Sequence, residues 1–443
     1  MSRSRAGAPF TVFASPQRLS FTSTTRQNTN DSRVAQSDSD TGLQAQGLCR
    51  SRLALCSSHA LSTWGQRMWE FDVGLLMLEL YPDSLLLVSA YGLVSSAVQV
   101  LLGAYVGSYV DRTPRLKAGR SILGALGSTL SVEKEWTRAL CQGDSAALAR
   151  LNSGMRRIDL TCLIAAPIAA GLVMTYFGTP WAILLITAWN LAAWFPECWL
   201  LTYAQRQAPG LRREKEPTPT KPAPFLSKLA NGWSAYIRQP VLPAAVALAL
   251  LYLTVLSLGL LMTAYLKWGS MTEAELSLWR GAGALSGIAA TFTFPLLRSR
   301  AGLPSAGLAG IILQLLCLVT AVFPALLSRM GALVGKEGAI RILVAGVAAS
   351  RFGLWTFDLA LTQMLQEWVD QDQLGAVNGV QSSLQSVFTS LSYVAGLVLW
   401  RPEQFEWLML GSCGIVLTAT IMFSLFACAH RSQDDPLPVA GLG

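Results

Sequence analysis

Long apolar segments follow one another from about residue 52 to residue 430, and short polar loops separate them. Each is long enough to cross the hydrocarbon core of a bilayer as an α-helix, which takes about 20 residues. The pattern predicts an all-α, multi-pass membrane protein with about ten spans. We place these helices at residues 52–80, 84–110, 159–178, 180–204, 241–267, 274–298, 303–328, 341–368, 374–400 and 405–430.

One apolar stretch fits this scheme badly. Residues 118–132, AGRSILGALGSTLSV, are too short to cross the hydrocarbon core. We expect a re-entrant or interfacial piece, or the fused remains of a longer region.

A Pro-rich loop divides the apolar part of the chain into two groups of helices. It contains EPTPTKPAP and seven Lys or Arg residues. Two bundles joined by a cytoplasmic linker are typical of secondary transporters, whose substrate site lies between the bundles at mid-membrane. We therefore expect an N-terminal segment at 1–47, an N-terminal bundle at 48–204, the linker at 205–240, a C-terminal bundle at 241–430 and a tail at 431–443.

The first 30 residues contain four Arg and no Asp or Glu. A transit peptide has this composition, and so does a disordered cytoplasmic tail. Both interpretations stay open at this point.

Charge supports the membrane prediction and orients the helices. Only 14% of the residues are charged, whereas soluble proteins have about 25%. The net charge of +8 comes largely from short basic loops, such as 111–120 with its four Lys or Arg. These loops are expected on the cytoplasmic side, together with both termini.

Several function classes are excluded by what the sequence lacks. It has no P-loop, no Ser/His/Asp constellation and no Rossmann glycine fingerprint, so we expect neither an enzyme nor a cofactor. The basic residues do not alternate with aromatic ones, and we expect no nucleic-acid partner. Eight Cys without a CxxC pair indicate buried thiols, and two His exclude a multi-histidine metal site.

The first predicted span begins with an unusually polar run, HALSTWGQRMWEF, at residues 59–71. Gln66 and Glu70 are four residues apart and share one helix face. Charged residues inside a membrane are costly and usually functional, so this face could line a cavity and hold a cation. The alternative is that Glu70 pairs with Arg67 at the membrane edge.

Two later spans in the N-terminal half also carry polar residues. Asp159 lies just inside the helix that NSGMRRIDL, residues 152–160, opens, and Asn190 interrupts an otherwise apolar helix. Both could line the cavity that we predict beside Gln66 and Glu70. Asn190 could instead make a hydrogen bond between helices and do nothing more.

Two further motifs predict contacts that hold or gate the bundles. Arg351 and Asp358 lie two helical turns apart on one face and could pair across the bundle interface, as a gate or as a static ion pair. In GSYVDRTPRLK, residues 107–117, Asp111 could cap a neighbouring helix end. Arg112 and the basic residues after it would then hold the cytoplasmic face. An ordinary basic loop is the alternative.

Taken together, these blocks resemble the ferroportin family, solute carrier family 40. The resemblance is close in HALSTWGQRMWEF, VDRTPRLK, LYLTVLSLGLLMTAY, RFGLWTFDLALTQMLQE and VNGVQSSLQS, which occur in family order. It implies a major-facilitator-like fold of two bundles that exports Fe(II), or a related divalent metal, by alternating access. The metal-site residues it implies are Gln66, Glu70, Asp159 and Asn190. A plasma-membrane location is expected, with an organelle envelope as the alternative.

The chain departs from the family in three places. The family's helices three and four are largely missing near residues 118–132, which an incomplete coding sequence or a shortened transporter would explain. Animal members have Asp at the position of Gln66 and His at that of Glu70, although plant members also have Glu there. Leu260 and Ser392 stand where vertebrates have a metal-binding Cys and His. That Cys also recognises the hormone hepcidin, so we expect no hepcidin control.

Two alternatives to iron export remain at this point. One is a transporter of the same fold that carries another metal or a metal chelate, since a fold alone does not fix a substrate. The other is a truncated membrane protein that does not transport, which the missing helices favour.

Overall fold

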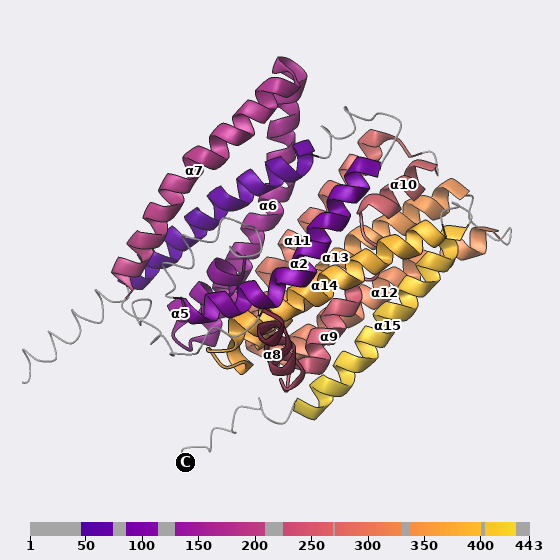
Figure 1. Cartoon of the computed structure of the whole chain (residues 1–443). Helices are drawn as coiled ribbons and strands as arrows, with labels where there is room; N and C mark the ends of the chain where they lie inside the picture. Colours follow the sequence, from indigo (N-terminus) through magenta and orange to yellow (C-terminus); the bar gives the residue numbers. More distant parts are fainter. Residues whose placement is uncertain are drawn as a thin grey trace, which may run out of the picture. The chain divides into compact units, whose positions relative to one another are not determined.

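A computed structural model describes residues 46–73, 86–113, 129–208, 225–268, 271–329, 336–399 and 404–430 (Figure 1). The chain divides after Gly47 into two units, and the second, Leu48–Gly443, carries all of the helices labelled in Figure 1. Within the described ranges every regular element is a helix.

In the N-terminal half the structure has a helix over residues 46–73 and five labelled elements. These are α2 (Leu86–Arg112), the π-helical segment η1 (Thr129–Trp136), α5 (Thr137–Cys141), α6 (Ser145–Phe177) and α7 (Thr179–Gln207).

The C-terminal half begins with α8 (Phe225–Ile237), which lies inside the predicted linker. It continues with α9 (Leu242–Leu251), α10 (Leu260–Trp268), α11 (Glu273–Ala301), α12 (Leu303–Arg329), α13 (Lys336–Trp368), α14 (Leu374–Val398) and α15 (Phe405–His430).

Most predicted helices agree with these bounds to within a few residues, but α6 begins much earlier than expected. The predicted span begins at residue 159, whereas α6 begins at Ser145. Asp144 is its N-cap, and its side chain accepts a hydrogen bond from Ala147 N at 3.0 Å. This bond holds the pKa of the Asp144 carboxyl below its usual value. The first turns of α6 are too polar to be recognised as part of a span from hydropathy. The structure accommodates their polar side chains because these side chains bond to α13.

The predicted helix at 241–267 is wrong as a continuous element, because it is broken between Leu251 and Leu260. Side chains from other helices satisfy the backbone groups that the break exposes. The Ser412 hydroxyl of α15 accepts from Val255 N at 3.0 Å, and Arg351 of α13 donates to the Leu256 carbonyl at 2.8 Å. Broken helices occur within membranes where the freed backbone groups find such partners.

Apolar side chains on the outer helices are exposed. On α7 they include Trp181, Leu184, Leu191, Phe195 and Trp199. Such a surface suits contact with lipid chains. By length and composition, five described helices qualify as membrane spans, or six if the bent pair of α8 and α9 counts as one. The total of ten stays a prediction, and residues 118–128 lie outside the described part.

Close helix contacts occur within the halves and between them. In the C-terminal half α13 packs against both α11 and α12, and a large apolar core lies among these helices, α9 and α15. Between the halves, α2 packs along α14 (Figure 1), and α6 packs against α11. Gly residues on α2 and α14 bring those two backbones into direct contact, since a Cβ at Gly107 would lie 2.0 Å from the Gly375 carbonyl oxygen.

Candidate functional site

The polar run in the first helix forms a single stripe. His59, Thr63, Gln66 and Glu70 are spaced by four, three and four residues, and this spacing keeps them on one face. His59 and Thr63 are buried, Gln66 is half-buried and Glu70 is exposed. The stripe therefore runs from the packed interior of the protein to its surface.

Glu70 has two partners from its own helix. The Gln66 side-chain amide donates to Glu70 Oε1 at 2.9 Å, and Arg67 Nη1 donates to Glu70 Oε2 at 2.7 Å. The alternative Arg67–Glu70 pair is therefore present, and Gln66 bonds to the same carboxylate. Gln66 lines a pocket of about 210 Å³ between the halves, whereas Glu70 is not one of its lining residues.

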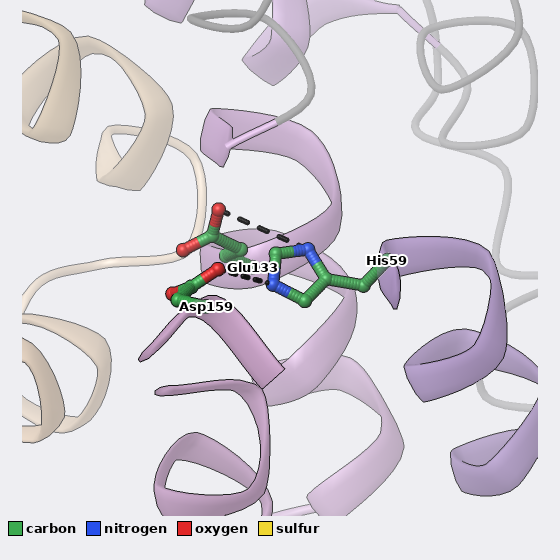
Figure 2. Close-up of side chains that lie close together, drawn as sticks. All are labelled: His59, Glu133 and Asp159. Carbon is green, nitrogen blue, oxygen red and sulfur yellow. Dashed lines mark hydrogen bonds and ion pairs between the residues drawn. The ribbon is translucent and has the colours of Figure 1, made fainter. Parts of the chain in front are cut away.

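Asp159 lines the same pocket as Gln66, as the sequence predicted, but its closest partners are different residues. Its Oδ1 lies 2.8 Å from His59 Nε2, and its Oδ2 accepts from Arg156 Nη1 at 3.3 Å. Glu133, from η1, approaches the other side of the imidazole, with Oε1 at 4.0 Å from His59 Nδ1. Figure 2 shows His59 between the two carboxylates.

His59, Glu133 and Asp159 therefore form a cluster with metal-ligand chemistry. One ligand atom from each lies within 4.8 Å of the others. Neither His59 nor Glu133 was predicted as a site residue from the sequence. His59 could have been found by extending the spacing of Gln66 and Glu70 back by two turns. Glu133 gave no signal, because η1 comes to His59 only through the packing of distant segments.

Asn190 takes no part in this pocket. It lies on the exposed side of α7 and packs at Gly65, where an added Cβ would lie 2.4 Å from Asn190 Oδ1. This position agrees with the alternative that Asn190 serves contact between helices. A larger residue at Gly65 would therefore require the side chains of Asn190 and Trp189 to move.

An ion pair joins the two halves beside the cluster. Arg156 Nη2 of α6 donates to Asp358 Oδ2 of α13 at 2.6 Å, and the guanidinium carbon lies 4.6 Å from the centre of the Trp355 ring. The predicted pair between Arg351 and Asp358 is therefore wrong. Arg351 instead donates to the Leu256 carbonyl, which the broken helix leaves without a helical partner.

Further hydrogen bonds join the halves near the C-terminal end of α13. Asn152 donates to Gln366 at 2.6 Å, and Lys134 donates to Thr362 at 3.0 Å. With the Arg156–Asp358 pair, these contacts form a polar belt between the N-terminal and C-terminal halves. We call it the cross-half belt.

The predicted capping by Asp111 is confirmed. Its two carboxylate oxygens accept from Gly375 N at 2.8 Å and Ala376 N at 2.7 Å, at the start of α14. A carboxylate is favourable at this position because a helix N-terminus is positively polarised. The side chain of Arg112 lies outside the described part.

A family model described as Ferroportin1 (FPN1) matches residues 50–125 and 121–416. The chain belongs to the ferroportin family. The two matched segments meet at 121–125, where the sequence analysis expects the family's third and fourth helices to be missing.

Individual members of the ferroportin family agree with this. Solute carrier family 40 member 1 of Oryza sativa subsp. japonica is 34% identical over 441 residues, covering 85% of this chain and 90% of that protein. Ferroportin of Homo sapiens is 27% identical, covering 87% of this chain and 92% of its own length.

A bacterial homologue of the iron transporter ferroportin, crystallised in an outward-facing state, matches with a TM-score of 0.73 and 25% identity. The match covers 85% of this chain and 99% of the bacterial one. The all-α, major-facilitator-like fold class is thereby confirmed.

The C-terminal half of this ferroportin-family chain holds a second pocket, of about 270 Å³, at the break between α9 and α10. Ser257, Arg351 and Ser392 are among its lining residues. Ser392, at the family's His position, donates to the Thr389 carbonyl at 2.8 Å. The side chain of Leu260 lies outside the described part, and a leucine offers no ligand atom to a metal.

Proposed function

We propose that this ferroportin-family chain exports a divalent transition metal, Fe(II) first, by alternating access. The observation that carries the proposal is the pocket between the halves, which Asp159, Glu133 and Asp358 line. A pocket of about 210 Å³ suits an ion with part of its water shell better than a bulky chelate. Its oxygen ligands suit hard and borderline cations.

The cross-half belt and the Asp111 cap act together in this proposal. Both join the halves at the ends that carry the basic loops, which we place in the cytoplasm. The similarity to an outward-facing bacterial structure supports the same assignment of state. Export would then require these contacts to break when the chain opens toward the cytoplasm and to form again around the metal.

Glu70 is proposed as a second acidic ligand, with Gln66 beside it and Asn190 as a packing residue. We expect Glu70→Gln to reduce iron efflux by about tenfold or more, because it removes the charge and nearly keeps the shape. The measurement is radio-iron efflux from cells expressing each form at equal surface level.

Arg67→Gln is the matched control for Glu70→Gln. It breaks the same ion pair and leaves the carboxylate in place. Equal loss of efflux in both variants would show that Glu70 acts as the partner of Arg67 and not as a metal ligand.

Hepcidin is expected to have no effect on this chain. Leu260 lacks the thiol that the resemblance assigns to hormone recognition. The check is binding of labelled hepcidin to cells expressing the chain, with a vertebrate ferroportin as the positive control. Saturable binding that depends on metal would contradict the expectation. For this export role we propose a plasma-membrane location.

A non-transporting, truncated family member is the second candidate. The alignment with the rice protein spans 441 positions yet covers only 85% of this chain, so the rice protein has residues that this chain lacks. This candidate predicts no efflux above background from the unmodified chain. Efflux restored by inserting the rice protein's residues at 118–128 would then locate the defect in the missing helices.

A further inference from the structure

We propose that His59, Glu133 and Asp159 form a divalent transition-metal site, separate from Glu70, through which the exported metal passes. The inference rests on the proposed function, since it adds a second metal site to the same transport pathway. It is carried by the geometry of three side chains from three segments, which the fold brings together around one imidazole (Figure 2).

The cluster is built into the protein interior. His59 is 4% exposed, and the side chains of Asp159 and Glu133 are 11% and 17% exposed. Burying ionisable groups in this way is costly unless they are paired. Asp159 and Glu133 also line the pocket between the halves, so an ion in that pocket can reach them. The ligand atoms of His59, Glu133 and Asp159 already lie within 4.8 Å of one another. A contraction of about 1 Å would bring them to the spacing of ligands around one metal.

The donor set selects a class of metal. Two carboxylates alone would suit Ca²⁺ or Mg²⁺, whereas an imidazole nitrogen favours Fe, Zn, Ni and other transition metals. The second shell is partly in place, because Arg156 contacts the second oxygen of Asp159. Such outer partners orient ligands.

Nearby cations keep the site from holding its metal tightly. Arg156 contacts Asp159 directly, and Lys134 and Arg67 line the same pocket. Their positive charge opposes a bound divalent ion. A transport site must release its ion, so it needs binding that is favourable on entry and weak enough for exit.

The position of the cluster fits the start of an export route. His59 and Glu70 are eleven residues apart on the polar stripe, about 16 Å along a helix. By the predicted orientation His59 lies nearer the cytoplasm. A metal leaving the cell would therefore meet His59, Glu133 and Asp159 before it reaches Gln66 and Glu70.

Asp159 also links the site to the cross-half belt. It shares Arg156 with Asp358, the anion on the other half. A metal bound to Asp159 competes with Arg156 for the Asp159 carboxylate. Occupancy of the site therefore changes the pairing that holds the halves together.

The test is Co(II) binding to the purified full-length chain, followed by the visible absorption of the bound ion. We expect His59→Gln and Glu133→Gln each to weaken Co(II) binding by about tenfold or more, since even outer partners of a ligand are worth that much. His59→Gln should also remove the spectral contribution of a nitrogen ligand. Glu337→Gln, the control at an exposed carboxylate in the first turn of α13, should keep both the spectrum and the affinity.

Unchanged affinity and spectrum in both variants would overturn the site, and so would equal loss in Glu337→Gln. Glu133→Gln decides the matter if His59→Gln fails to fold, because it preserves shape at a half-buried position. Iron efflux by the wild type is measured in parallel. Efflux with unchanged Co(II) binding in the variants rejects the site and keeps the proposed function. If the variants lose Co(II) binding but the wild type shows no iron efflux, the metal site stands and the proposed function is rejected.

Discussion

Gly375→Leu is expected to abolish export by preventing the two halves from closing at the basic side. A Cβ at Gly375 would lie 2.5 Å from the Gly107 carbonyl oxygen and 2.6 Å from Asp111 Oδ1. Overpacking a well-packed core costs about 1–3 kcal/mol. Here the obstacle is the backbone of α2, which cannot move aside unless the helices separate. The larger side chain should therefore shift the population toward the state open to the cytoplasm.

The shift can be measured as a distance between spin labels on α2 and α14, in parallel with iron efflux. Gly411→Leu is the matched control. It also lies within a long helix, and no described atom outside its own helix lies within 4 Å of the Cβ that would be added there. A closed-state distance and normal efflux in Gly375→Leu would show that the contact between α2 and α14 does not govern closure.

Asp358→Asn is expected to cause a comparable loss, because it leaves Arg156 without its partner on the opposite half. Removing one partner of a buried ion pair typically costs about 3–5 kcal/mol. Among the described residues, the Arg156 guanidinium would keep the Asp159 carboxylate, which His59 already engages. The closed state should lose most of this energy, since it is the state in which Arg156 and Asp358 meet.

A double-mutant cycle separates this pairing from general damage. Arg156→Gln combined with Asp358→Asn should be less harmful than the sum of the two single changes, because neither group is then left charged and unpaired. Arg150→Gln, at an exposed position of α6, serves as the control. The readouts are the label distance between the halves and the thermal unfolding midpoint in detergent. Strict additivity in both would rule out a direct contribution of the pair to closure.

Hydropathy located most of the helices because membrane spans are long and uniformly apolar. The predicted ends of the last two helices, at 374–400 and 405–430, lie within two residues of those of α14 and α15. Hydropathy failed where polar side chains are satisfied by distant partners. Residues 145–158 fell outside the predicted span because they are polar, and the partners of Asn152 and Arg156 lie on α13, about two hundred residues away.

The candidate site was predicted in part. Local spacing was enough to place Gln66 and Glu70 on one face, and helix polarity was enough to expect a cap from Asp111. The partners of Asp159 could not be read in the same way. Its neighbours His59 and Glu133 come from separate segments, and their approach depends on how η1 and α6 pack.

The sequence by itself predicted a multi-helix membrane protein with a polar stripe on its first helix and basic loops on the cytoplasmic side, and its motifs resemble those of the ferroportin family. These properties follow from composition, periodicity and motifs, all of which are local along the chain. The tertiary structure alone decided which charges meet. In the folded protein Arg156 pairs with Asp358, Arg351 donates to a carbonyl in the broken helix, and His59 lies between two carboxylates. Such contacts depend on distances between segments far apart in sequence, and those distances are fixed only when the helices pack.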